Sequence, residues 1–227
     1  MSGRPGDWLV IPAYNEGQVI ASTLHDALAY FQNVVVVDDC SNDDTRAIAA
    51  QAGAHVCRHP INLGQGAALQ TGIDYAVAQG ANRIVTFDAD GQHRPIDAIS
   101  MLETIEREGC DVVLASRFLG EAEGISQRKR RFLQLATWYT RITTGLSVTD
   151  THNGLRALSR RAAMTIRIEQ NRMAHASEIL AEIARHGLSY VEVPCTIIYT
   201  SYSKAKGQRM SGAFAILFDL YIRRLYR

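Results

Sequence analysis

The chain has 227 residues, of which 47% are hydrophobic and 21% are charged. This composition is ordinary for a globular protein and excludes disorder, collagen and coiled coil, and the length is sufficient for one large core. Lysine and arginine number 24 against 23 for aspartate and glutamate, so the net charge of +1 indicates no general attraction to nucleic acid. We expect a single domain over residues 1–227 without a nucleic-acid partner.

The cysteines and the apolar stretches limit the cellular setting. The four cysteines lie far apart, and none forms a C-x-x-C pair, so neither a disulfide framework nor a structural zinc site is indicated. The first residues lack the pattern of a signal peptide. No stretch approaches the ~18 apolar residues of a membrane-spanning helix. We therefore expect a cytoplasmic protein that is not integral to a membrane by itself.

Short runs rich in valine and isoleucine alternate with longer segments of helical spacing, which is typical of a mostly parallel sheet flanked by helices. The expected strands are Trp8–Ile11, Val34–Val37, His55–Cys57, Arg83–Phe87 and Val112–Ala115. The helices expected between them span about Gly17–Phe31, Thr45–Ala52, Gly66–Gln79 and Pro95–Arg107. The fold class is therefore α/β.

Beyond Arg117 this alternation changes. The pattern predicts a long helix, a strand, a second helix and an extended segment, at about Arg130–Leu146, Leu155–Leu158, Ser177–His186 and Tyr190–Tyr199. A last amphipathic helix is expected at about 210–226. Its apolar face suits either its own domain or a lipid surface, and the sequence does not decide between them.

Ligands of open parallel sheets bind beyond the carboxyl ends of the strands, and here those positions are unusually polar. The second expected strand is followed by D-D-C-S-N-D-D-T, in which Ser41 to Thr45 suit a helix cap. Asp38 and Asp39 repel each other unless something binds them, and a base or ribose hydroxyl is one such binder. After the third strand, Gly64 and Gly66 let backbone N–H groups approach a phosphate or sugar, or simply begin a helix.

The sharpest signal follows the fourth expected strand, where the chain reads D-A-D-G-Q-H. Asp88 and Asp90 are hard oxygen ligands at a sheet edge, which suits Mg²⁺ or Mn²⁺ bound together with substrate phosphates. Gln92 offers a further carbonyl oxygen, whereas His93 is interpreted as a hydrogen-bonding neighbour. The alternative is a turn rich in aspartate and glycine.

Five ordered motifs, I-P-A-Y-N-E, V-V-D-D-C-S-N-D-D-T, N-L-G-Q-G-A-A-L, D-A-D-G-Q-H and S-R-F, resemble glycosyltransferase family 2. The resemblance covers roughly Leu9 to Gln208 and is strongest to the dolichyl-phosphate mannose synthase-like, polyprenyl-phosphate branch. It implies the GT-A nucleotide-diphospho-sugar transferase fold. It also implies that donor and metal are bound by the following residues: Pro12, Tyr14, Glu16, Asp38, Asp39, Asp88, Asp90 and Gln92. Gly64 and Gly66 are also predicted to bind the donor, because their loop begins at the same edge of the sheet.

Two further residues are candidates for catalysis. The breaking bond of a glycosyl diphosphate develops negative charge, and Arg117, after the fifth strand, is placed to stabilise it unless it forms only a surface ion pair. Asp150 begins D-T-H-N-G-L-R, which resembles the family's acceptor loop. It is the candidate general base if the acceptor is a hydroxyl. A lipid phosphate with a second pKa of ~6 needs no strong base.

Basic residues mark the acceptor side. Arg130 and, less closely, Arg131 match residues that contact the lipid phosphate in the synthases this segment resembles, although Gln134 stands where the family often has serine. Ser203, Lys204 and Lys206 are further candidates for binding this phosphate. Here Thr200 stands where the dolichyl-type pattern usually has arginine, which leaves the acceptor open.

These patterns predict a metal-dependent, inverting glycosyltransferase that moves a sugar from a GDP- or UDP-linked donor to polyprenyl phosphate at the cytosolic membrane face. A membrane protein is a possible partner. One alternative transfers to a saccharide hydroxyl, and another is a nucleotide-sugar-binding module without turnover. The sequence does not choose the nucleotide, the sugar or the oligomeric state.

Overall fold

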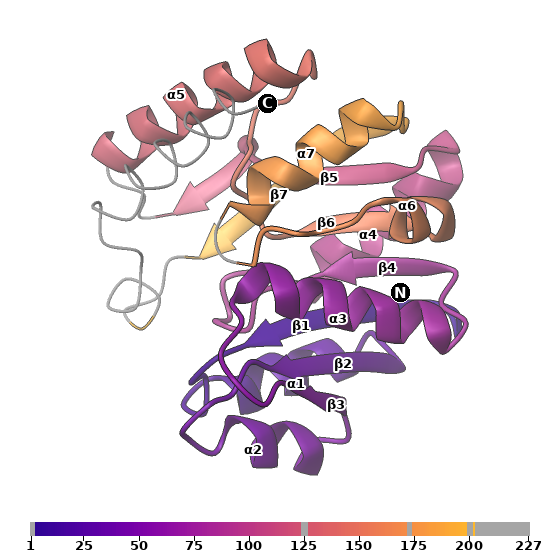
Figure 1. The fold of residues 1–227 in the computed structure, drawn as a ribbon, viewed down its shortest axis with the longest axis vertical. Coiled ribbons are helices and arrows are strands. Elements are labelled where there is room, and N and C mark those ends of the chain that lie inside the picture. The colour runs from indigo at the N-terminus through magenta and orange to yellow at the C-terminus, as the bar shows by residue number, and fades with distance from the viewer. Residues whose placement is uncertain (1–2, 124–126, 172–173, 199–201, 203–227) are drawn as a thin grey trace.

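The computed structural model describes residues 3–123, 127–171, 174–198 and 202. Within them, seven strands form one sheet in the order β3-β2-β1-β4-β6-β5-β7, and helices cover both of its faces (Figure 1). The strands are β1 (Asp7–Ala13), β2 (Asn33–Asp38), β3 (His55–Arg58), β4 (Arg83–Thr86), β5 (Val112–Glu123), β6 (Arg156–Ser159) and β7 (Tyr190–Ile198). The helices are α1 (Ile20–Leu28), α2 (Thr45–Gln51), α3 (Gln65–Ala78), α4 (Pro95–Glu108), α5 (Gln127–Thr144), α6 (Arg160–Thr165) and α7 (His175–Arg185). The predicted α/β class with a mostly parallel sheet is confirmed.

Strand direction determines which loops meet. β1 runs parallel to β2 and β4, and β5 runs parallel to β7, whereas β6 is antiparallel to both β4 and β5. Thr86 at the end of β4 is therefore paired with Arg156 at the start of β6. As a result, the loop that precedes β6 lies at the same sheet edge as the carboxyl ends of β1, β2 and β4.

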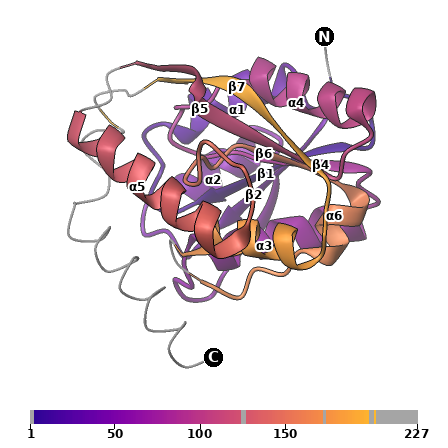
Figure 2. The ribbon, with the colours of Figure 1, turned by 90° about the horizontal axis from the view of Figure 1, so that it is seen from above.

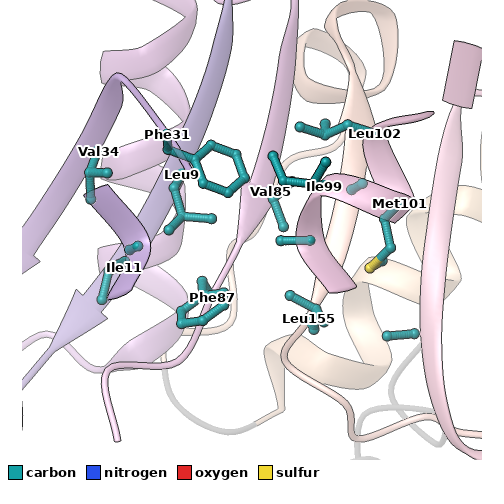
Figure 3. Close-up of a cluster of buried hydrophobic side chains, with 14 of the residues drawn as sticks. Leu9, Ile11, Phe31, Val34, Val85, Phe87, Ile99, Met101, Leu102 and Leu155 are labelled. Carbon is teal, nitrogen blue, oxygen red and sulfur yellow. The ribbon is translucent and has the colours of Figure 1, made fainter. Parts of the chain in front are cut away.

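Alternation along the central strands explains why both faces of the sheet are buried. On β1, Leu9 and Ile11 belong to one hydrophobic cluster and Trp8 and Val10 to the other. Figure 3 shows the first cluster, in which β1 side chains and Val85 of β4 lie on the same side as α4. Helices α3, α6 and α7 cover the second cluster on the opposite face, as Figure 2 shows from above. Burial of apolar area on both faces stabilises the sheet at ~25 cal/mol per Å².

Several elements differ in extent from the sequence-based expectation, such as α5, which spans Gln127–Thr144 rather than about Arg130–Leu146. Helix α1 begins at Ile20 rather than Gly17, and the Gly17 N–H donates to Asp43 in the loop after β2. Strand β5 continues to Glu123 through an irregularity between residues 116 and 121. The short helix α6 was not expected, and its N-cap is Ser159, whose hydroxyl accepts from the Ala162 N–H at 3.1 Å.

Two membrane-related expectations concern different parts of the chain. The helix expected at about 210–226 lies outside the described residues. Among the helices that are described, none has both the length and the apolar character needed to cross a bilayer.

Candidate active site

The loops after β1 and β2 are joined by hydrogen bonds at the carboxyl edge of the sheet. The Asn15 N–H donates to the Ser41 hydroxyl at 2.9 Å, and the Glu16 N–H donates to the Thr45 hydroxyl at 2.8 Å. Asn15 and Cys40 adopt left-handed backbone conformations with φ of 53° and 63°, which mark tight turns. The N-cap of α2 is Asp44, which makes no side-chain cap hydrogen bond. Ser41 and Thr45, from the segment predicted to cap this helix, instead hold the two loops together.

Three predicted donor-binding residues lie at the end of β1 or on the loop after it. Pro12 is buried within β1, whereas the Tyr14 side chain is exposed. The Glu16 side chain is nearly buried and accepts a hydrogen bond from the Tyr202 hydroxyl at 2.8 Å. Burial, followed by the hydrogen bond to Glu16, raises the pKa of Tyr202. The predicted phosphate ligands that follow Tyr202 lie outside the described residues: Ser203, Lys204 and Lys206.

The two adjacent acids at the end of β2 have different partners. Asp38 accepts the Ser41 N–H at 3.0 Å. One oxygen of Asp39 receives the Leu63 N–H at 2.9 Å and lies 2.7 Å from Nδ1 of His59, while its other oxygen receives the Gly64 N–H at 2.7 Å. The groups that bind the Asp39 carboxylate are therefore the His59 side chain and the backbone N–H groups of Leu63 and Gly64.

Gly64 and Gly66 are required by backbone geometry. Gly64, the N-cap of α3, has a φ of 102°, a backbone angle that residues with a side chain rarely adopt. A Cβ on Gly66 would lie 1.9 Å from the Gln170 carbonyl oxygen. The loop therefore fits closely against its own chain, and its glycines begin α3 as the simpler alternative predicts.

Asp88 is turned toward protein groups. Its carboxylate lies 3.0 Å from Nε2 of His93 and accepts from the Gln65 amide at 3.2 Å. Gly154, in the loop before β6, lies so close that an added Cβ would be 2.4 Å from a carboxylate oxygen of Asp88. Burial opposes ionisation of Asp88, but the His93 hydrogen bond and the nearby positive charges outweigh it, so its pKa is lowered.

Asp90 lines a hollow of about 220 Å³ between α1 and the loop after β4. The Gln92 side chain amide donates to its carboxylate. Burial, and then the charge of Asp88, raise the pKa of Asp90. Two neighbouring carboxylates with excess negative charge fit a divalent cation, which would relieve their repulsion.

The ligand set also limits how such a cation is held. The described part of the chain contains no cluster of three or more histidine, cysteine, aspartate or glutamate side chains arranged around a metal position. Magnesium-type sites in enzymes of phosphorylated substrates use one or two carboxylates and complete the shell with water and phosphate oxygens. Asp90, Asp88 and the Gln92 carbonyl oxygen fit that pattern.

Arg117 and Asp150 bind each other. The Arg117 Nε lies 2.6 Å from Asp150 Oδ2, and the Arg117 backbone N–H donates to the same oxygen at 3.1 Å. The two side chains are 6% and 0% exposed, respectively. Arg117 also donates to the His152 carbonyl oxygen at 2.9 Å. The arginine therefore forms an ion pair, as its alternative interpretation anticipated, but the pair is buried rather than at the surface.

Glu192 of β7, which the sequence analysis did not single out, holds the loop of Asp150. Its carboxylate accepts the Thr149 N–H at 2.8 Å and the Asp150 N–H at 3.3 Å. Beside this loop, burial lowers the pKa of His152 to about 4, with the charges of Arg156 and Arg117 acting in the same direction and Asp150 opposing them. His152 is therefore neutral and a weak base near pH 7.

A buried arginine lies under the same loop. Arg156 is 3% exposed and donates to the carbonyl oxygens of Thr151 and Ala176. Burial lowers its pKa to about 10, against the opposing charges of Asp88 and Asp150. Arg156 remains a cation at neutral pH, and its positive charge interacts with both acids.

Helix α5 presents basic and apolar side chains to solvent. Arg130 and Arg131, the predicted phosphate ligands, are both exposed at its beginning. Leu135, Trp138 and Ile142 are 55%, 59% and 59% exposed and recur at the spacing of one helix face. The opposite side of α5 is tied to the loop of Asp150, because the Thr137 hydroxyl donates to the Thr149 carbonyl oxygen at 3.4 Å.

Several residues that shape the site were missed. His59 follows β3 but is separated from Asp39 by 20 residues, and Glu192 lies 42 residues from Asp150. Neither belongs to a local motif, so only the pairing of distant strands reveals them. A weak signal existed for His59, which occupies a strand end just before the N-L-G-Q-G loop.

Comparison with known proteins agrees with the geometry. The model of the family described as "Glycosyl transferase family 2" matches residues 8–167. UDP-N-acetylglucosamine–dolichyl-phosphate N-acetylglucosaminyltransferase of Methanococcus voltae is 30% identical over 96% of this chain and 96% of that protein. Undecaprenyl-phosphate mannosyltransferase of Micrococcus luteus is 32% identical over 89% of this chain and 86% of that protein.

The solved structures confirm the fold. Glucosyl-3-phosphoglycerate synthase from Mycobacterium tuberculosis, in complex with Mn²⁺ and UDP-glucose, has a TM-score of 0.70 and 20% sequence identity. The similarity covers 92% of this chain and 74% of that chain. At this level of identity the similarity establishes the architecture alone.

Proposed function

Because this chain belongs to glycosyltransferase family 2 and has the GT-A fold, we propose that it transfers a sugar from a nucleotide-linked donor to the phosphate of a polyprenyl lipid. The predicted family is thereby confirmed, and the named relatives support its polyprenyl-phosphate branch. The donor, the acceptor, the metal and the stereochemical course are parts of the proposal.

The observation that carries the acceptor assignment is the burial of Asp150. A hydroxyl acceptor must lose its proton and requires a general base within reach. The Asp150 carboxylate is 0% exposed and is bound to Arg117, while His152, with a pKa of about 4, is a weak base. A phosphate with a second pKa of ~6 is largely ionised at pH 7 and needs neither group. The site therefore favours a phosphate nucleophile.

The proposed reaction is a single displacement that inverts the anomeric centre. A phosphate oxygen of the acceptor forms a bond to the anomeric carbon as the bond from that carbon to the donor diphosphate breaks. The nucleoside diphosphate leaves with the bonding electron pair, and no proton transfer is needed. Alignment of the two bonds supplies much of the rate enhancement.

On the donor side, Asp90, Asp88 and Gln92 would hold a Mg²⁺ or Mn²⁺ ion. When bound, such an ion neutralises the charge that develops on the departing diphosphate. Tyr14 and Glu16 lie beside the loop after β2 and are assigned to the nucleotide. Arg117 and Asp150 neutralise each other and together hold the loop before β6 in place on the acceptor side.

Helix α5 supports a lipid acceptor. An exposed apolar face of Leu135, Trp138 and Ile142 continues from the exposed arginines at positions 130 and 131. Helices that lie in a membrane interface combine an apolar face with lysine or arginine, which binds anionic head groups. We assign this face to the cytosolic surface of a membrane, where α5 brings the acceptor phosphate toward the loop of Asp150.

The test is product analysis. The protein is incubated with Mn²⁺, a panel of UDP- and GDP-sugars, and vesicles containing undecaprenyl phosphate. Vesicles containing undecaprenol, which has the same chain without the phosphate, are the matched control. We expect a glycolipid that resists mild alkali and is cleaved by acid, and no product from undecaprenol. Transfer to a saccharide hydroxyl, or donor binding without turnover, contradicts the proposal.

A further inference from the structure

A chain of hydrogen bonds connects α3 to the end of β2 through a histidine. The His59 Nε2 lies 2.9 Å from the Thr71 hydroxyl, and its Nδ1 lies 2.7 Å from the Asp39 carboxylate. The His59 and Asp39 side chains are 8% and 4% exposed. The contacts are therefore shielded from water, which strengthens them.

The partners of Asp39 determine the direction of these hydrogen bonds. An ionised carboxylate only accepts, so the His59 Nδ1 carries the proton that lies toward Asp39. In the neutral imidazole, Nε2 then accepts from the Thr71 hydroxyl. Each polar atom of the imidazole has a partner, and the ring is held in one orientation.

The same carboxylate organises the next loop. It receives the backbone N–H groups of Leu63 and Gly64, and Gly64 is the N-cap of α3 with a φ of 102°. The Asn62 side chain also donates to the Asp39 carbonyl oxygen at 3.2 Å. The shape of residues 62–66 thus depends on the position of one carboxylate, which depends in turn on His59.

We propose that His59, oriented by Thr71, is a positioning residue for the nucleotide-linked sugar. It holds the Asp39 carboxylate against the backbone of residues 63 and 64 and thereby sets the loop that borders the donor. This inference rests on the proposed function, because the donor is assigned to the carboxyl edge of the sheet, which this loop borders. It predicts that a substitution of His59 that breaks its bond to Asp39 raises the KM for the donor and leaves kcat nearly unchanged.

Two substitutions separate the two bonds of the imidazole. His59→Asn places an amide N–H near the position of Nδ1 and keeps the bond to Asp39. His59→Gln extends further, keeps the bond to Thr71 and leaves Asp39 without this donor. His55→Asn, at an exposed histidine of β3, is the matched control. Thr71→Val removes only the distal bond and serves if His59→Gln does not fold.

The first readout needs no substrate. Amide hydrogen exchange at Leu63 and Gly64, followed by NMR, should accelerate in His59→Gln by about tenfold or more, because one bond to the charged Asp39 is lost. Exchange in His59→Asn should stay near the wild-type rate, and Thr71→Val should lie between the two. Unchanged exchange in His59→Gln, or in Thr71→Val if His59→Gln does not fold, overturns the positioning role.

The second readout is kinetic. With Mn²⁺ and the preferred nucleotide-sugar, His59→Gln should raise the donor KM by about tenfold, and His59→Asn should restore it to near the wild-type value. Equal impairment of the two variants would indicate that only ring packing matters and overturns the inference. A wild-type protein that transfers no sugar contradicts the proposed function, whereas the exchange experiment still decides the role of His59.

Discussion

The rim of the site, meaning the carboxyl edge of the sheet and the loops at that edge, has two halves that use their charged side chains in different ways. In the half formed by β1, β2 and β4, Asp90 lines a hollow, and burial together with the charge of Asp88 raises its pKa. In the half formed by β5 and the loop before β6, Arg117 and Asp150 neutralise each other beneath the surface. The first half presents charge to a ligand, and the second uses charge to hold a loop. A carboxylate that lies near a reaction centre therefore does not necessarily act as a general base.

The largest effect is expected at Asp90. Asp90→Asn keeps the size of the side chain but removes the charge that would hold a divalent cation, which contributes several kcal/mol to transition-state stabilisation. We expect the transfer rate to fall by about a thousandfold or more. Initial rates with a labelled nucleotide-sugar and Mn²⁺ measure the loss.

The hollow itself offers the control for this variant. Asp26 of α1 lines the same hollow and is exposed, so Asp26→Asn changes the net charge equally without touching the loop after β4. We expect this variant to retain nearly full activity. If Asp90→Asn stays as active as Asp26→Asn, the first half of the rim does not bind a cation through Asp90.

The second effect tests the buried pair. Asp150→Asn leaves the Arg117 cation without its charged partner, and removing one member of a buried pair costs about 3–5 kcal/mol. We expect the free energy of unfolding, measured with urea, to fall by this amount, together with a loss of activity. Asp74→Asn, in an exposed pair with Arg167 at 2.9 Å, should change stability by less than about 1 kcal/mol.

The outcome separates two roles of Asp150. If Asp150 acted only as a general base, Asp150→Asn would be inactive but would have an unchanged free energy of unfolding. Such a result would reverse the comparison, because the second half of the rim would then also present charge to a substrate. It would also favour a hydroxyl acceptor over a phosphate.

The first half of the rim could be located from sequence because its residues follow strands directly. Asp38, Asp88 and Asp90 each come within a few residues of a run of buried valine, isoleucine or phenylalanine. In a parallel sheet these ends meet at one edge, so local patterns suffice to bring the residues together. The partners of Asp39 could not be predicted, because His59 reaches it only when β2 and β3 pair.

The second half could not be assembled in this way. The pairing of Arg117 with Asp150 depends on β6 running antiparallel between β4 and β5, which no motif specifies. Local motifs predicted a separate role for each residue, Arg117 as a phosphate-binding cation and Asp150 as a base. The loop that carries Asp150 is also bound by Glu192 on β7, which lies far along the chain.

A third effect concerns pH and the loop of the second half. The pKa of His152 is lowered by burial to about 4 in the folded chain, against 6.5 for a free histidine. On acidification the unfolded chain therefore binds the proton first, so this contribution to stability is complete above pH 6.5 and is lost as the pH falls toward 4. We expect a loss of at most about 3 kcal/mol over that range.

His152→Gln should flatten this part of the stability profile, measured by urea unfolding at half-unit steps of pH. His25→Gln, at an exposed histidine of α1, should leave the profile as it is in the wild type. An equally steep loss of stability in His152→Gln would mean that the loop is open to water, and the contrast between the two halves would weaken.

The smallest effect is expected at the beginning of α5, where the second half of the rim meets the proposed membrane surface. Arg130→Ala removes one exposed cation, which near an anionic lipid surface contributes about 1 kcal/mol, so the KM for polyprenyl phosphate in vesicles should rise about fivefold. The donor KM and kcat should not change, since Arg130 is assigned to the acceptor phosphate. Arg46→Ala, on α2 beside the opposite end of the sheet (Figure 1), provides the control with the same loss of charge. An equal effect of both variants would show that net charge, and not the position of α5, governs access to the lipid.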